Sequence, residues 1–66
     1  MKINVNKTGS NDKGIWIYGV ADLGGLEISA IFSTNLKELP KVGDTLTIKK
    51  IRMVNGKNKM FYLLTF

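Results

Sequence analysis

Two aromatic side chains lie close together in the apolar segment of residues 15–21, where one residue separates Trp16 from Tyr18. Residues at this spacing in an extended strand point to the same face. Exposed aromatic rings stack nucleic-acid bases with little regard to sequence, and each stacked base contributes about 1 to 3 kcal/mol. The pair therefore predicts a surface for unpaired bases, provided that both rings point away from the core.

Cations that would accompany such a surface are concentrated late in the chain. The sequence has ten Lys and Arg residues against five Asp and Glu, a formal net charge of +5, and no acid follows Asp44. This pattern is typical of polyanion-binding domains, although a lysine-rich solubilising surface gives the same charge. About five phosphate contacts would weaken single-strand binding on the order of a hundredfold between 50 and 200 mM salt. The cations expected to contact phosphate are Lys13, Lys49, Lys50, Arg52, Lys57 and Lys59.

The residue inventory argues against catalysis. The chain has no histidine and no cysteine, which removes the usual general base and the strongest nucleophile. Its acids are scattered over turns without metal-ligand spacing, and Gly24-Gly25 is not part of a phosphate-binding loop motif. We therefore predict a non-enzymatic protein without cofactor, metal or small-molecule substrate.

Length and composition predict a single domain spanning residues 1–66. A chain of 66 residues without cysteine must fold on a thin apolar core, alone or through self-association. No apolar stretch approaches the roughly 20 residues that span a bilayer, and the N-terminus lacks the pattern of a secretory signal. We expect a cytoplasmic protein without a membrane partner.

Short apolar runs, punctuated by Gly, Asn and Asp, predict an all-β fold. Asn55-Gly56 is a strong hairpin signal, and Pro40 closes a short segment that begins with hydroxyl residues able to cap a helical turn. The predicted elements are strands at residues 2–7, 15–21, 26–32, 45–54 and 59–66, a loop at 8–14 and a helical turn at 35–39.

The predicted strand that carries Trp16 and Tyr18 is apolar on both faces, so its facing is open. If Ile17 points into the core, the aromatic pair points outward; the opposite phase would make the rings the filling of a small barrel. Phe61 and Tyr62 present the same alternative, one inward and one outward, and Tyr62 is the candidate assigned to the binding surface.

The predicted fourth strand changes its apolar phase by one residue. Leu46 and Ile48 share one parity, whereas Ile51 has the other. A β-bulge near Lys49 and Lys50 would return these side chains to one face and bend the strand, as happens where small barrels turn a corner.

Three strands, a short helical turn and two further strands follow the element order of the OB-fold, a five-stranded, partly open Greek-key barrel. A five-stranded SH3-like barrel is the main alternative, because its strands are equally short. The chain has an MKINV first strand, a second strand with Trp and Tyr, a basic KVGDTLTIKKIR segment and a VNGKNK hairpin. In this plan it resembles, over its full length, the minimal OB-fold single-stranded-DNA-binding proteins of bacterial phages and plasmids.

This resemblance implies that a single strand of DNA crosses the second and third strands, beneath the loops that join the first to the second and the fourth to the fifth. RNA remains possible, because stacking and phosphate contacts do not select the sugar. The expected binding residues are Trp16, Tyr18, Tyr62 and the six cations named above.

A function of another class uses the same aromatic face. Trp16 and Tyr18 would serve equally as anchors for a protein partner, as in a phage-type inhibitor or adaptor. Under either function we predict a homodimer, since the core is thin, an open barrel has strand edges, and the chain ends in an apolar segment with Leu63, Leu64 and Phe66.

Overall fold

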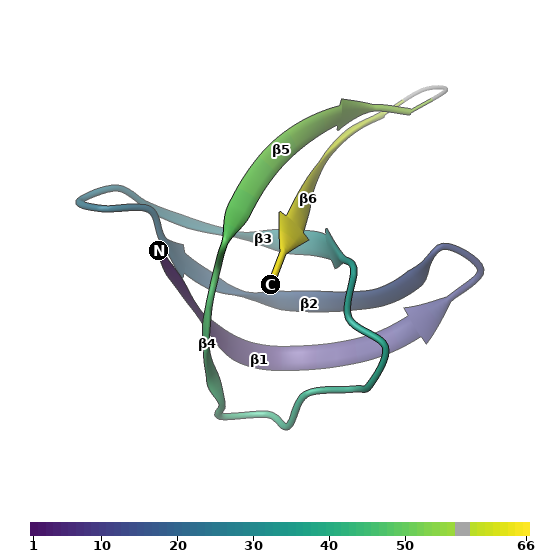
Figure 1. Cartoon of the computed structure of the whole chain (residues 1–66), viewed down its shortest axis with the longest axis horizontal. Coiled ribbons are helices and arrows are strands. Elements are labelled where there is room, and N and C mark those ends of the chain that lie inside the picture. The colour runs from purple at the N-terminus through teal and green to yellow at the C-terminus, as the bar shows by residue number, and fades with distance from the viewer. Residues whose placement is uncertain (57–58) are drawn as a thin grey trace.

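Six strands form one mixed β-sheet in the computed structural model, which describes residues 1–56 and 59–66, and those residues contain no helix. Neighbouring strands are hydrogen-bonded in the order β4-β1-β2-β3-β6-β5, with β3 and β6 parallel and the other pairs antiparallel. In Figure 1, β1, β2 and β3 form a curved layer from which β5 and β6 rise. The predicted all-β class is confirmed. The strands are β1 (Lys2–Asn11), β2 (Gly14–Asp22), β3 (Glu27–Thr34), β4 (Thr45–Thr47), β5 (Lys50–Asn55) and β6 (Met60–Thr65).

The two end strands of the sheet, β4 and β5, follow each other in the chain. Between them, the Ile48 N–H donates to the carbonyl of Met1, and the Lys49 N–H donates to the carbonyl of Thr65. The chain thus leaves β1 and joins β6 within two residues. The strand ladder itself ends at β4 and β5, so the predicted five-stranded, partly open barrel is not confirmed.

The predicted phase change within residues 45–54 is confirmed. Leu46 and Ile48 precede the break between β4 and β5, Ile51 follows it, and all three pack in or against the same core cluster. The predicted single strand with a β-bulge is instead two strands, and the break between them takes up the extra residue, so β4 pairs with β1 and β5 with β6.

The predicted helical turn at residues 35–39 is not found. The Thr34 hydroxyl accepts a hydrogen bond from the Leu36 N–H, and the Asn35 N–H donates to the carbonyl of Leu64 on β6. The second bond ties the segment to β6. In a segment this short, the few helical hydrogen bonds would not offset the unfavourable free energy of starting a helix. The connection to β4 is therefore irregular.

β1 continues to Asn11, so most of the predicted loop at residues 8–14 is strand. Its register with β2 shifts between Val5 and Lys7, which leaves one extra residue in β1 and allows pairing to continue. The Thr8 hydroxyl also donates to the backbone of β2. The polar composition of this segment predicted a loop, but backbone pairing with β2 makes residues 8–11 part of a strand.

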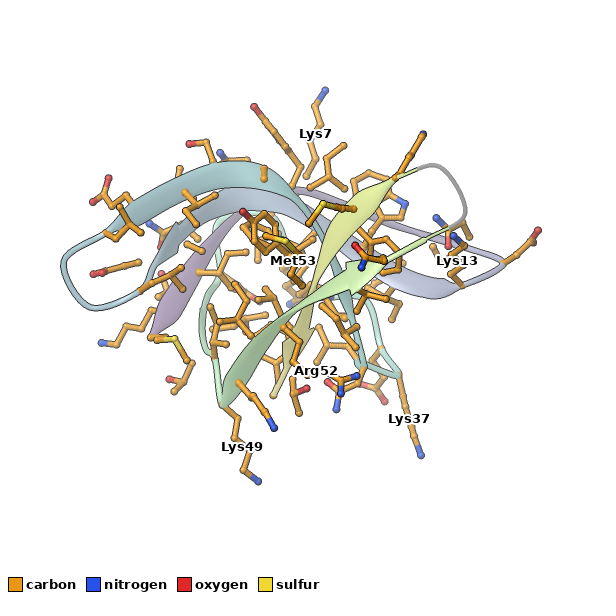
Figure 2. All side chains as sticks on the ribbon, turned by 90° about the horizontal axis from the view of Figure 1, so that it is seen from above. Lys7, Lys13, Lys37, Lys49, Arg52 and Met53 are labelled. Carbon is orange, nitrogen blue, oxygen red and sulfur yellow. The ribbon has the colours of Figure 1, made fainter. Side chains whose placement is uncertain are left out.

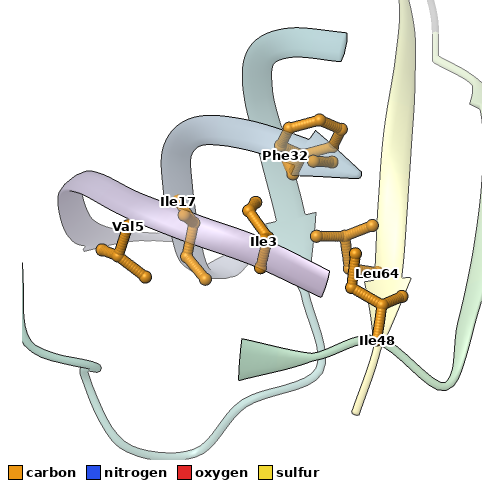
Figure 3. Close-up of a cluster of buried hydrophobic side chains, with 7 residues drawn as sticks. Ile3, Val5, Ile17, Phe32, Ile48 and Leu64 are labelled. Carbon is orange, nitrogen blue, oxygen red and sulfur yellow. The ribbon is translucent and has the colours of Figure 1, made fainter. Parts of the chain in front are cut away.

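The core gathers inward residues from four strands and from the break between β4 and β5. Figure 3 shows these side chains pointing toward one another from β1, β2, β3 and β6. Every second residue of β2 contributes to this inward row. The outward face of β2 is therefore defined by the core. The buried cluster comprises Ile3, Val5, Ile17, Ala21, Phe32, Ile48 and Leu64.

Candidate nucleic-acid interface

β2 alternates between a buried face and an outward face. Ile15 and Ile17 are buried, whereas Trp16 is half-buried and Tyr18 is 40% exposed. The predicted facing is thus confirmed, and the alternative in which the aromatic rings fill the core is wrong. Both rings are presented by a strand that is paired on both sides.

Gly19 lets β2 approach β1 closely. A Cβ atom at this position would collide with the carbonyl oxygen of Asn4, which belongs to the backbone and cannot turn aside. Gly19 pairs with Val5, immediately before the register shift of β1. This contact fixes the register that next pairs Tyr18 with Lys7.

The Trp16 indole covers Gly9 of β1. The two residues are cross-strand partners, and a Cβ added to Gly9 would lie 2.6 Å from the nearest ring atom. Aromatic residues often cover strand glycines in this way. Trp16 therefore stabilises the β1–β2 pair, and its half-exposed ring also remains within reach of a ligand.

Strand pairing extends the outward surface around Tyr18. Tyr18 lies between Lys7 of β1 and Ile31 of β3, and Ile31 is 62% exposed. Figure 2 shows Lys7 projecting from this side of the sheet. We call Lys7, Trp16, Tyr18 and Ile31 the aromatic face. The outward facing of Ile31 agrees with its alternation in residues 26–32, whereas Lys7 was not predicted as a site residue, since its place beside Tyr18 depends on the register between β1 and β2.

Lys13 connects the first hairpin to β6. Its Nζ atom lies 5.3 Å from the centroid of the Phe61 ring, a cation–π contact. Figure 2 shows Lys13 at the end of the molecule where β5 ends and β6 begins. Lys59 is exposed just before β6, and Lys57 lies outside the described residues. Two of the predicted cations, Lys13 and Lys59, are thus at this end.

Tyr62 does not join the aromatic face. Its ring packs against Phe32 with a centroid separation of 5.7 Å, and it contacts the core cluster. The adjacent Phe61 has the opposite parity and carries the contact to Lys13. The assignment of Tyr62 to the surface was wrong, because parallel pairing with β3 places Tyr62 beside Phe32 on the inner side.

The cations around β5 are separated from the aromatic face. Arg52 and Trp16 belong to one cross-strand row, but three strand spacings, about 14 Å, lie between them. Figure 2 shows Lys49 and Arg52 pointing to the side opposite Lys7. The expectation that Lys49, Lys50 and Arg52 surround the aromatic pair is therefore not met, because the sheet curves between β2 and β5.

Other kinds of site receive no support in the described part of the chain. Within residues 1–56 and 59–66, no group of three His, Cys, Asp or Glu side chains could hold a metal ion. The same residues include no helix of the length and apolarity needed to cross a membrane. No protein-family model, curated protein or solved structure matches the chain. Function must therefore be argued from the site.

Proposed function

We propose that this chain binds single-stranded DNA on the aromatic face, with bases stacked on Tyr18 and Trp16. The observation that carries the proposal is the exposed ring of Tyr18, held on a paired strand with Lys7 on one side and Ile31 on the other. A base can lie on the ring while the ammonium group contacts the backbone phosphate. Large exposed side chains grouped on a regular sheet are typical of a binding surface.

We further propose that the sheet works as an OB-type barrel. The antiparallel pairing of β4 with β1, the pairing of β5 with β6 and the parallel pairing of β3 with β6 support this fold. In this fold, β4 and β5 would be two halves of one bent strand, joined by Ile48 and Lys49. The six strands would then correspond to the five strands of an OB-fold.

The salt dependence should be weaker than sequence analysis predicts. Among the described cations, Lys7, Lys13 and Lys59 lie near the aromatic face or at the adjoining end of the molecule. About three phosphate contacts give a slope near −2 in log affinity against log salt, or roughly a twentyfold loss between 50 and 200 mM.

The test is a titration of Trp16 fluorescence with oligo-dT at low and moderate salt, run beside fluorescence polarisation. Tyr18→Ala should weaken binding between about fivefold and about 150-fold, as expected for the loss of one stacking surface of about 1 to 3 kcal/mol. Val20→Ala, on the same outward row of β2, is the matched control and should leave binding unchanged. Absence of binding to wild-type protein, or equal effects of the two substitutions, would refute the proposal. Oligo-U in the same titration separates RNA from DNA.

A protein partner is the second candidate, and the exposure of Ile31 favours it. An aliphatic side chain beside Tyr18 suits a hydrophobic anchor as well as a base. Such an interface would change little with salt, whereas binding to phosphates falls steeply. Binding of oligo-dT that falls steeply between low and moderate salt would support the nucleic-acid function over a protein partner.

A homodimer remains a proposal, with less support from the C-terminal strand than expected. Leu64 is fully buried within one chain, and Leu63 and Phe66 are half-buried. Leu26 and Met60 are examples of exposed apolar residues near strand ends. Sedimentation that gives only a monomer at high concentration would exclude the dimer.

A further inference from the structure

The cations of β5 form a separate charged surface. Lys50 and Arg52 are both exposed and lie on one face of β5, two residues or about 7 Å apart. Their cross-strand partners on β6 are Thr65 and Leu63, which carry no side-chain charge. Lys49 is exposed at the break that precedes β5. We call Lys49, Lys50 and Arg52 the cationic ridge.

The ridge and the aromatic face point in different directions. In Figure 2, Lys49 and Arg52 project from one side of the molecule and Lys7 from the other, with Lys37 on the side of the ridge. Arg52 lies about 14 Å from Trp16 along one cross-strand row, so a strand stacked on the aromatic face would have to bend around the curved sheet to contact the ridge as well.

The ridge suits phosphates rather than bases. Its positive groups lie on flexible stems, and their partners on β6 offer no aromatic ring for stacking. Closely spaced cations without an intervening acid bind a polyanion through its backbone. We propose that the ridge binds the phosphates of a second nucleic-acid segment, so that one chain holds two segments at once. This inference rests on the proposed function for the first segment.

Holding two segments has a consequence for complementary strands. When both are bound to one molecule, their effective concentration rises and the encounter becomes intramolecular. The ridge would thereby allow each chain to accelerate strand annealing, an activity that one binding surface on one chain does not provide.

The test counts oligonucleotides per chain by native mass spectrometry. The probe is a thymidine tetramer, at the short end of the roughly 4 to 16 nucleotides covered by one OB-fold. The wild-type chain should bind two tetramers, whether it is a monomer or a dimer. Lys50→Gln/Arg52→Gln should bind one and keep the Trp16 quenching. Lys2→Gln/Lys41→Gln removes the same charge elsewhere and should still bind two.

An annealing assay with labelled complementary strands gives the second readout. The ridge variant should lose the acceleration that wild type and control share, and its salt slope for tetramer binding should fall by about 1.4. One tetramer per wild-type chain with normal Trp16 quenching overturns the inference and leaves the proposed function intact. Absence of quenching refutes the proposed function itself.

Two other results would also overturn the inference. If the ridge variant self-associates but still binds two tetramers, the cations serve only to keep the edge of β5 from pairing with other chains. If instead it loses binding to phosphatidylserine vesicles and keeps two tetramers, the ridge is a membrane contact.

Discussion

β2 and β5 were both expected to carry the binding surface, and they differ in what holds them. β2 pairs with β1 and β3 over most of its length, and Ile17 on its inner row is fully buried. β5 lies at the end of the sheet, where it pairs with β6, and Met53 on its inner row is 54% exposed.

The difference shows which chemistry each strand can support. Stacking needs a ring held in one place, and a strand fixed by core packing and two neighbours holds Tyr18 in this way. Phosphate contacts need only mobile charge within reach, so Lys50 and Arg52 can function on a strand that packing fixes less firmly. Under the proposed function, base contacts would therefore belong to β2, and β5 would suit contacts with the phosphate backbone.

The largest expected loss of stability comes from a substitution that disturbs the close approach of β2 to β1. Gly19→Ala sets a methyl group against the Asn4 carbonyl, so the strands must separate, and we expect a loss of about 3 kcal/mol or more in the free energy of unfolding. Gly9→Ala is the control, because its added methyl group meets only the Trp16 side chain, which can move. It should cost about 1 kcal/mol.

Urea denaturation of both variants, with Trp16 emission as the probe, measures these losses. Gly9→Ala should also shift the emission of the folded protein, because the indole must leave its place over the glycine. Equal losses for the two variants would show that β1 and β2 are not held by the contact at Gly19, and the contrast with β5 would lose its basis.

The next effect compares the inner rows of the two strands directly. Ile17→Ala leaves a cavity among fully buried neighbours and should cost about 2 to 5 kcal/mol. Met53→Ala removes a side chain that is mostly in water and should cost less than about 1 kcal/mol. Thermal or urea unfolding of the two variants gives the comparison, and similar losses would mean that β5 is packed as firmly as β2.

The contrast between local and long-range determinants also explains which features of the fold could be predicted from the sequence. The all-β class and the phase change after Ile48 follow from local alternation, and the structure confirms them. Local alternation left the facing of Trp16 and Tyr18 open, and the packing of the other row of β2 into the core decides it. The facing of Tyr62 was missed because it depends on the parallel register with β3, which pairs residues far apart in the sequence.

Longer-range geometry was the second limit. Lys49 and Arg52 were placed beside Trp16 because the chain order suggested a small barrel, but curvature of the sheet directs them to another side. Lys7 was omitted because nothing in its own segment indicates that it pairs with Tyr18. Residue types that bind a single strand were recognisable, whereas their grouping required the strand order.

The smallest effect concerns the contact that joins the first hairpin to the β5–β6 hairpin. A cation–π pair at an exposed site contributes about 0.5 to 1 kcal/mol, and Lys13 over Phe61 is such a pair. A double-mutant cycle with Lys13→Met and Phe61→Leu isolates it, since each variant keeps an apolar side chain of similar size. We expect a coupling energy of this magnitude from urea unfolding, reduced little by salt.

Lys41→Met is the control for Lys13→Met, because Lys41 is also exposed but lies in the connection before β4. It should leave the unfolding free energy unchanged and show no coupling to Phe61→Leu. A coupling energy of zero for Lys13 would mean that the two hairpins are not held together by this pair. β5 and β6 would then be joined to the first three strands through the short parallel pairing of β6 with β3 and the packing of Leu64 and Tyr62 in and against the core.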